Sequence, residues 1–507
     1  MTRRRRTRPG RRRAAASTGH HRHLENPFEP LRVLADDHVV HIHETAVRYL
    51  ADHGLRVLFD EARQLLVAGG AASSHANELV RFDPDAVAAA MSSAPSHFEL
   101  RAPNPERNIA VGGRSVALLP VAGPPFVSDR RRGRRAGTLA DQENFLRLAQ
   151  SFDVMAAGSP SVEPTDVPLP IRHLRSVFAA LTLTDKTLFF YARGRRRMRD
   201  GFEIVKLRHG LRSDEELATS PRCWTVINTN SPRQLDTPMA MGIIDFARMG
   251  QMTIITPFTL AGAMAPVTLA GALVLQHMEF LAGLTLSQVV RPGAPVVYGG
   301  FTSNVDMRSG APAFGTPEAF KAALASGQLA RHVGVPWRSS GSSASNAVDA
   351  QAGYETMMNT YGAVLGGANW IQHAAGWQEG GLTADYEKFI VDVEMCQMLA
   401  EALQPLVVDE SSLALDAISD VGPGGHFFGT QHTLDRFATA FYEPLVFSRA
   451  NFEQWTDAGS KRTDERATTV WEDVLARYAP PPLDDGVRAA LTDFVERRIA
   501  EGGADPD

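Results

Sequence analysis

The residues best suited to bind a ligand in this sequence follow short β-rich runs and are mostly aromatic or amide side chains. Nine of them are Asn228, Asn230, Phe258, Tyr298, Phe301, Trp337, Trp370, His373 and Trp377. Aromatic faces attract quaternary ammonium groups, at about 0.5–2 kcal/mol per contact once water is excluded. Several such rings together are a candidate cage for a methylated amine, although a single ring on a strand more often packs in a core.

A polar run, SSGSSASNAV at 339–348, lies among these residues. Its small side chains allow backbone N–H groups and hydroxyls to approach a ligand closely. Asp349 then begins a predicted helix as its N-cap residue, with Gln351 and Glu355 in the first turns. We interpret five further residues in or after this run as substrate-binding, namely Ser342, Ser345, Asn346, Gln351 and Glu379. Gln372 and Gln378 are expected next to the site.

A repeated pattern along the chain positions these residues. From about residue 150 onward, β-rich runs that end in Gly, Pro, Ser or Asn alternate with helical segments. The runs lie at 152–160, 187–194, 223–232, 252–262, 295–306, 335–341, 368–377 and 414–425. Helices are predicted between them, for example at 237–250, 316–334 and 349–367, and the last two end in glycine as helix C-termini often do.

Eight alternations of strand and helix predict an α/β fold, a (β/α)8 TIM barrel. An open doubly wound sheet normally carries a phosphate-binding glycine loop after its first strand, and neither G-x-G-x-x-G in that position nor a Walker sequence occurs. We predict a disordered basic tail at 1–25, an N-terminal mixed helical segment at 26–137 packed on the barrel, and the barrel with C-terminal helices at 138–507. Loops after barrel strands converge on one face, so the residues named above should meet there.

The composition, with 44% hydrophobic and 21% charged residues, is that of a soluble globular protein. A net charge of -5 gives no nucleic-acid signature for the body of the chain. Cys223 and Cys396 fit neither a disulfide framework nor a metal site, so we expect core residues and a reducing, cytoplasmic location. The apolar stretch 253–286 is interrupted by prolines and glycines, which predicts a strand, a loop and a buried helix and no membrane span.

Clusters of arginine and histidine suggest other partners. The arginines of the 1–25 tail are read as a solvated arm, with an electrostatic arm for an acidic protein or nucleic acid as the alternative. A second arginine cluster at 128–141 is either a surface turn or an anion or partner site, and it ends in a helix-start pattern. His38, His41 and His43 are expected on a surface helix, and no metal site is predicted.

Several stretches carry a resemblance to a known family. They are 266–300, DAQAGYE at 349–355, 367–394, VGPGGHFFGTQHTLDRF at 421–437, FYEPLVFSR at 441–449, and Trp455. On these stretches the chain resembles the trimethylamine methyltransferase family over about residues 27–500. The resemblance implies a (β/α)8 barrel that moves a methyl group from an amine to the cobalt of a separate corrinoid protein, in methanogenesis-related one-carbon metabolism.

One departure from the family bears on the substrate. The archaeal trimethylamine enzymes carry pyrrolysine, an electrophilic residue that binds or activates the amine, whereas this chain has standard residues throughout. The resemblance places the missing side chain after Trp337, where Ser342, Ser343, Ser345 and Asn346 are all candidates for its position. A neutral tertiary amine needs an electrophile to become a leaving group, but a quaternary ammonium already carries the charge. A betaine-like donor is therefore implied, as in glycine betaine methyltransferases.

On this interpretation the chain binds no cofactor, and cobalamin is carried by the partner corrinoid protein. The barrel would orient and desolvate the donor, and catalytic residues stay unassigned. A donor carboxylate would need N–H or cationic donors, for which the 339–348 run, His373 or an arginine could serve. The alternatives are a trimethylamine:corrinoid methyltransferase and a non-catalytic betaine-binding or regulatory barrel.

The glycine-rich segment at 421–433 is expected to form a tight irregular loop after the last strand. It would cover the mouth or contact the corrinoid protein. His426 and His432 within it are read as structural, with lower-axial or proton-handling roles as the alternative. A homo-oligomer is expected by analogy with barrel enzymes in general.

Overall fold

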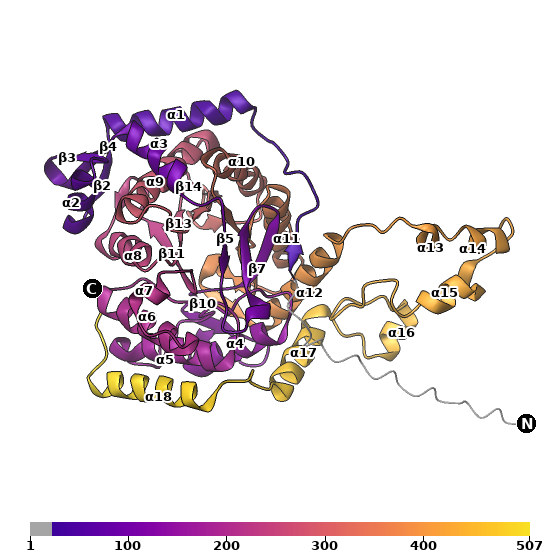
Figure 1. Cartoon of the computed structure of the whole chain (residues 1–507). Coiled ribbons are helices and arrows are strands. Elements are labelled where there is room, and N and C mark those ends of the chain that lie inside the picture. The colour runs from indigo at the N-terminus through magenta and orange to yellow at the C-terminus, as the bar shows by residue number, and fades with distance from the viewer. Residues whose placement is uncertain (1–22, 507) are drawn as a thin grey trace, which may run out of the picture.

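The computed structural model of the chain describes residues 23–506, so the predicted basic tail lies almost entirely outside the described residues. A curled sheet of mostly parallel strands lies at the centre, and helices surround it (Figure 1). Its strands, in the order in which they are hydrogen-bonded, are β1 (Leu24–Glu25), β7 (Ser115–Pro120), β19 (Trp370–Ala375), β18 (Trp337–Ser340), β15 (Val296–Gly299), β13 (Met252–Pro257), β11 (Cys223–Thr229) and β10 (Leu188–Phe189). All neighbours from β7 to β10 pair in parallel.

Residues 152–160 lie between the two ends of this parallel series. Ala157 forms an isolated parallel bridge with Thr187, next to β10. On the other side, the Ala156 N–H donates to the Leu118 carbonyl of β7 at 2.8 Å. The run that we predicted as the first strand thus forms no regular strand, but it lies between β10 and β7 and is hydrogen-bonded on both sides. The fold is mixed α/β, and its central sheet is curled.

The predicted strand at 414–425 is wrong. Leu415–Asp420 is a helix, α14, in agreement with the helical spacing of Leu415 and Ile418. The strand that the prediction lacked is β7, an apolar run within the segment expected to lie outside the barrel. The first error overlooked this local helical spacing, whereas β7 was missed because its partner strand β19 lies far away in the sequence.

Helices follow the strands as predicted and cover the outside of the sheet. They are α4 (Leu139–Ser151), α5 (Leu169–Leu183), α6 (Arg195–His209), α7 (Asp214–Leu217), α8 (Thr237–Arg248), α9 (Leu269–Val290), α10 (Pro317–Val333), α11 (Ala350–Leu365) and α12 (Tyr386–Ala402). Their ends follow capping rules, since Asp349 accepts hydrogen bonds from the N–H groups of Gln351 and Ala352, and Gly334 ends α10 in the left-handed conformation. Thr138 caps α4, which confirms the predicted helix start.

Further elements lie outside the central sheet. The N-terminal part contains α1 (Asp36–Asp52), α2 (Asp60–Ala68), α3 (Pro84–Ser93), β2 (Leu55–Val57), β3 (Ala72–Ser74), β4 (Leu79–Phe82), β5 (His97–Leu100), β6 (Ile109–Gly112), η1 (Ala76–Glu78) and η2 (Pro105–Arg107). Between strands and helices lie β8 (Phe126–Ser128), β9 (Arg135–Ala136), β12 (Gln234–Leu235), β14 (Leu260–Ala261), β16 (Ser303–Val305), β17 (Pro312–Ala313), β20 (Trp377–Gln378), β21 (Thr383–Asp385) and η3 (Glu379–Gly381).

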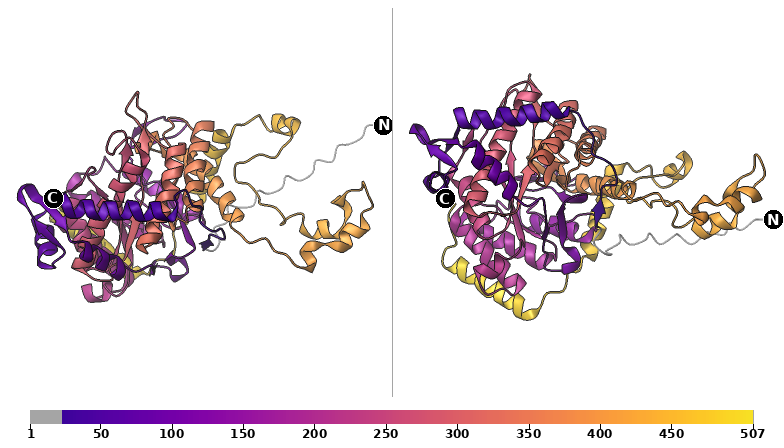
Figure 2. Two further views of the ribbon diagram at one scale, coloured as in Figure 1. Left: turned by 90° about the horizontal axis from the view of Figure 1, so that it is seen from above. Right: turned by 45° about the horizontal axis from the view of Figure 1, so that its top comes forward.

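The C-terminal region leaves the body and returns to it. Its elements are α13 (Glu410–Leu413), α14, η4 (Phe427–Gly429), α15 (Gln431–Arg436), α16 (Phe452–Asp457), α17 (Thr463–Arg477) and α18 (Asp485–Ala500). Helix α17 packs on α12, and α18 packs on α5 and α6. The segment at 421–433, predicted to follow the last strand, instead follows α14, contains η4 and continues into α15, well outside the body (Figure 2).

The second arginine cluster joins these parts through ion pairs. They are Arg130–Asp464, Arg131–Glu472, Arg132–Asp129, Arg134–Glu379, Arg135–Asp129 and Arg135–Asp141. The cluster therefore holds α17 and α4 against the β8–β9 hairpin.

The other compositional predictions fall on well-defined elements. One described helix, α9, is long and apolar enough to cross a membrane, but 78% of its most apolar stretch is buried inside the protein. Together with β13 it forms the strand and buried helix expected at 253–286. Cys223 and Cys396 are buried and free. His38 and His41 are exposed on α1, and no group of residues suited to hold a metal ion is found among residues 23–506.

A buried lysine supports the connection between β7 and β10. Lys186 is fully buried, and its Nζ donates to the carbonyls of Ala149, Phe152 and Met155 at 2.6–3.0 Å. These carbonyls lie where α4 ends and the 152–160 connection begins.

We predict that Lys186→Met destabilises the protein by roughly 3 kcal/mol or more, because it leaves three buried carbonyls without a donor at about 1–3 kcal/mol each. Urea unfolding followed by circular dichroism measures the change. Lys321→Met, on the exposed face of α10, is the matched control and should stay within about 0.5 kcal/mol of the wild type. Equal stability of the two variants would contradict the assignment.

Candidate active site

A cavity of about 380 Å³ opens where the parallel strands end. Residues from the ends of β7, β10, β11, β13, β15, β18 and β19 converge on it, as expected for loops on the carboxyl side of a parallel sheet. Its lining comprises Ala122, Gly123, Phe189, Tyr191, Ala192, Arg193, Val226, Asn228, Met239, Thr256, Phe258, Phe301, Arg338, Gln372, His373, Trp377, Gly380, Gly381 and Leu382. No carboxylate or thiol occurs among these lining residues.

A floor of packed aromatic rings closes the cavity from below. Trp224 and Trp370 meet edge to face with ring centroids 4.8 Å apart, and Phe189 lies 4.5 Å from Trp224. Trp224 and Trp370 are fully buried, so they set the depth of the cavity and do not line it.

The walls are aromatic. Phe258 and Phe301 stack with centroids 5.1 Å apart, and Trp377 lies 3.8 Å from the His373 ring and 6.4 Å from Phe301. Tyr191 also lines the cavity, with the Arg193 guanidinium carbon 4.3 Å from the centre of its ring. These rings form a compartment whose faces can surround a quaternary ammonium group.

Arg338 is the distinctive polar group of the cavity. Only 3% of the residue is exposed, and neither Nε nor Nη1 has a hydrogen-bond partner among the described residues. Burial lowers the pKa of its guanidinium to about 9, and the carbon Cζ lies 5.1 Å from the Phe301 ring centre. A buried cation without a partner is costly, so its place in a cavity points to an anionic group on the ligand.

Arg193 also lines the cavity, but its surroundings are different. It is about half exposed, and Glu163 lies 3.6 Å from it. A ligand anion would therefore gain less at Arg193 than at Arg338, where neither water nor a protein carboxylate competes.

His373 faces the cavity because of an irregularity in β19. Its φ of 60° is left-handed, and the register of β19 with β7 shifts between Ile371 and Ala375. Two successive residues, Gln372 and His373, can thereby line the cavity, which a regular strand does not allow.

Burial and the charge of Arg338 hold the pKa of His373 well below its usual value, so the ring is neutral. Its Nδ1 accepts a hydrogen bond from the Ala122 N–H at 3.3 Å. Nε2 therefore carries the ring proton and is a second donor for a ligand anion. Gln372 has protein partners on both sides of its amide, the Pro120 carbonyl and the Trp370 Nε1–H.

The polar run at 339–348 has a role different from the one predicted. Glu355 of α11 is buried, and its Oε2 accepts from the Ser343 hydroxyl at 2.8 Å and from the N–H groups of Ala344 at 2.8 Å and Ser345 at 3.0 Å. Gln351 donates to Oε1 of the same carboxylate at 2.7 Å. The small residues bring the backbone close to Glu355, so these N–H groups are already bonded within the protein.

The structure places five of the predicted residues around the cavity and nine elsewhere. The five are Asn228, Phe258, Phe301, His373 and Trp377, and the other nine are Asn230, Tyr298, Trp337, Ser342, Ser345, Asn346, Gln351, Trp370 and Glu379. Ser342 is buried beside Ser340, Ser345 belongs to the Glu355 loop, and Asn346 is exposed.

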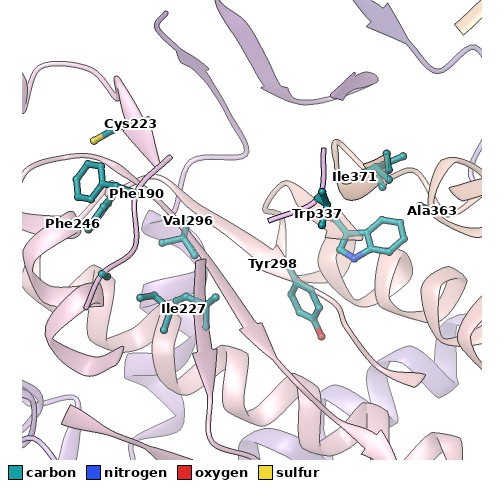
Figure 3. Close-up of a cluster of buried hydrophobic side chains, with 14 of the residues drawn as sticks. Phe190, Cys223, Ile227, Phe246, Val296, Tyr298, Trp337, Ala363 and Ile371 are labelled. Carbon is teal, nitrogen blue, oxygen red and sulfur yellow. The ribbon is translucent and has the colours of Figure 1, made fainter. Parts of the chain in front are cut away.

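Four of the nine are used in packing or in other polar contacts. Asn230 exchanges hydrogen bonds with Asp236, and Glu379 pairs with Arg134. Tyr298 and Trp337 lie among buried side chains between strands and helices (Figure 3) and are absent from the cavity lining. The Tyr298 hydroxyl bonds Gln276 and His277 of α9.

Sequence reasoning missed Arg338, although a signal was present. Trp337 and Arg338 are neighbours on β18, so only one of them can face the cavity. The prediction chose the aromatic residue, whereas Trp337 packs against Gly327 and Gly366 of the helix layer. A charged residue inside an otherwise buried strand needs an explanation, and that could have identified Arg338.

We predict that Glu355→Ala disorders the 341–346 loop, because one hydroxyl and two backbone N–H groups lose their acceptor. Hydrogen exchange at the Ala344 and Ser345 amides should become at least tenfold faster, with a stability loss of roughly 2–3 kcal/mol. Glu318→Ala, at an exposed position in the first turn of α10, serves as the control and should leave both quantities unchanged. Unchanged exchange in the Glu355 variant would show that the carboxylate does not hold the loop.

Comparison with known proteins identifies the chain's relatives. The trimethylamine methyltransferase (MTTB) family model matches residues 2–503. A glycine betaine methyltransferase of Desulfitobacterium hafniense (strain Y51) is 36% identical over 93% of this chain and 98% of the relative. A trimethylamine methyltransferase MttB of Desulfitobacterium hafniense (strain DSM 10664 / DCB-2) is 30% identical, covering 92% of this chain and 94% of the relative.

The solved monomethylamine methyltransferase (MtmB) of Methanosarcina barkeri aligns with a TM-score of 0.45 at 12% identity, covering 90% of this chain and 94% of that one. The family match spans nearly the whole sequence and agrees with the relatives in length. This chain therefore belongs to the trimethylamine methyltransferase family.

Proposed function

We propose that this enzyme transfers a methyl group from a quaternary amine that also carries a carboxylate, a betaine, to the corrinoid of a separate protein. The observation that carries this proposal is the unpaired guanidinium of Arg338 inside an aromatic cavity. The similarity to a glycine betaine methyltransferase, 36% identical, supports the same donor class.

The two ends of a betaine match the two kinds of cavity wall. Its carboxylate would pair with Arg338 and accept from Nε2 of His373, in charge-assisted bonds of about 1.5–3 kcal/mol. Its trimethylammonium group would lie against the faces of Phe258, Phe301 and Trp377, at about 0.5–2 kcal/mol per desolvated ring.

The lining residues suit a donor that needs no activation. A quaternary nitrogen already bears the positive charge that allows it to leave, whereas a neutral tertiary amine requires an electrophile. His373 is neutral, and the lining residues include no carboxylic acid that could protonate a tertiary amine. The protein's contribution is then to orient the donor and to exclude water.

A corrinoid on the partner would supply the nucleophilic cobalt as methyl acceptor, and the C–N electron pair would stay on nitrogen, so that a tertiary amine leaves. The chain's own contribution is to fix the carboxylate on one side of the cavity and to direct a methyl carbon toward the opening. A corrinoid protein could dock on exposed apolar side chains of three loops. They are Val267 after β14, Met307 after β16 and Leu382 after η3.

We also infer that the central sheet closes into a (β/α)8 barrel. The bridge from Ala157 to Thr187 and the hydrogen bond from Ala156 to Leu118 support closure through the 152–160 connection. Closure would explain why seven strand ends meet at one cavity. The two free, buried cysteines support a reducing compartment such as the cytoplasm.

The test is anaerobic incubation with reduced corrinoid protein and a panel of glycine betaine, carnitine, choline and trimethylamine, followed by the cobalt absorption spectrum. Glycine betaine or carnitine should methylate cobalt fastest. In Arg338→Met, kcat/KM for the carboxylate-bearing donors should fall at least 100-fold, because about 3 kcal/mol of binding is lost, and that for choline should change less than about threefold.

Arg193→Met is the matched control, because this arginine is half exposed and close to Glu163, and it should lower kcat/KM less than about fivefold. Methylation from trimethylamine alone would overturn the quaternary-donor proposal. Tight binding of betaine without methylation from any donor would instead support a binding module.

The aromatic walls should act on the ammonium end alone. Trp377→Leu and Phe301→Leu should each weaken binding of glycine betaine and of choline by about 3–30-fold, the range expected for one cation–π contact. Isothermal titration measures both dissociation constants. Their ratio should stay constant, and a loss confined to the betaine would assign these rings to the carboxylate end. Phe452→Leu, at an exposed position on α16 outside the cavity lining, is the control and should leave both constants unchanged.

A further inference from the structure

We propose that residues 404–441, termed the arm, dock on a second copy of this chain and that two arms are exchanged in a dimer. The arm contains α13, α14, η4 and α15 and projects away from the body, as both views in Figure 2 show. It begins where α12 ends, and the chain returns to the body at Val446, whose N–H donates to Glu394 of α12.

The arm exposes far more apolar surface than a free segment tolerates. Its large apolar side chains are 46–89% exposed, and they are Leu406, Val407, Val408, Leu413, Leu415, Ile418, Phe427, Phe428, Leu434, Phe437 and Phe441. At 150–250 Å² for a whole aromatic side chain, this amounts to on the order of 1,000 Å², above the few hundred Å² of the largest apolar patch on a typical monomer. It is also at least as large as the roughly 800 Å² per partner of a stable interface.

The arm is nevertheless an organised element. Asp409 and Ser412 form a reciprocal capping box at α13, and Thr430 caps α15. Arg436 Nη2 donates to the Ser411 hydroxyl at 3.0 Å and ties the two halves of the arm together. Ala417 is the one residue of the arm that is buried. A segment with capped helices and no core of its own is typical of an element that completes its packing on another chain.

The position of the arm favours a second copy over the corrinoid protein. Helix α12 follows β21 at the cavity end and runs antiparallel to the strands, so its last residue, Ala402, lies toward the opposite end of the sheet. The arm thus leaves the body on the side away from the cavity. A partner that must bring its cobalt to the cavity would have to bind elsewhere.

The same chain presents an apolar face near the root of the arm. Tyr361 and Met398 are 39% and 40% exposed, near the C-terminal ends of α11 and α12, which pack against each other. The segment before α1 lies beside them, because the Leu31 N–H donates to the Leu365 carbonyl at 2.7 Å, and it exposes Phe28 and Leu31 by 48% and 47%. We call Phe28, Leu31, Tyr361 and Met398 the acceptor face.

A twofold dimer would bury both surfaces at once, since each chain carries one arm and one acceptor face. Reciprocal exchange doubles the buried area without any further element. The proposal does not depend on the donor or on the corrinoid protein, because neither is needed for the two chains to associate.

Sedimentation equilibrium of the wild type at micromolar concentration should give twice the 55.1 kDa of one chain. Phe428→Asp with Phe437→Asp in the arm should give the mass of one chain, with an unchanged far-ultraviolet circular dichroism spectrum as evidence that the body is folded. Tyr361→Asp with Met398→Asp in the acceptor face should do the same. Val67→Asp, an exposed apolar position on α2, is the control and should leave the dimer intact.

Mixing the two double variants tests reciprocity. One supplies an intact acceptor face and the other an intact arm, so the mixture should contain a species of two chains that neither variant forms alone. A mixture that stays at the mass of one chain would overturn the pairing of arm and face. A wild type of one-chain mass would also overturn the proposal, and a gain in mass only after adding corrinoid protein would assign the arm to that partner.

Discussion

Side chains alternate between the two faces of a β-strand, and this alternation decides what the cavity contains and what the helices cover. On β18 it sends Trp337 into the helix layer and Arg338 into the cavity. On β15 it sends Tyr298 toward α9. On β19 the left-handed conformation of His373 breaks the alternation, and a donor for an anion is gained next to the aromatic wall. The alternation of each strand therefore decides which side chains reach the cavity, and so determines the chemistry of the site.

Several buried charges in the body of the protein are satisfied by the chain itself. Lys186 donates to three carbonyls, Glu355 accepts from the loop that follows β18, and Glu279 accepts from Thr229, Ser231 and the Arg233 N–H. Arg338 contrasts with these groups, because two of its nitrogens lack a partner among the described residues. Because Arg338 also lines the cavity and no carboxylate lies among the lining residues, its unpaired nitrogens support an anionic ligand.

Much of the architecture could be predicted, because local signals determine helices and strands that follow each other along the chain. Capping rules correctly place the starts of two helices at Asp349 and Thr138 and the end of one helix at Gly334. The strand β7 could not be assigned, because its partner β19 lies some 250 residues further along. The aromatic residues at strand ends, such as Phe301 and Trp377, were found from composition. The bonding of the 339–348 run could not be predicted, because its carboxylate partner, Glu355, comes from the following helix, and local sequence does not show which groups are already paired.

The unpaired guanidinium also makes ligand binding sensitive to the inorganic anions around the protein. Chloride, sulfate and phosphate are small enough to enter a cavity of about 380 Å³, and each can pair with Arg338. Inorganic anions then compete with a zwitterion for one end of the site, while a purely cationic molecule meets no such competitor. The choice between the two kinds of molecule would thus shift with the ionic composition of the surroundings, with no change in the protein.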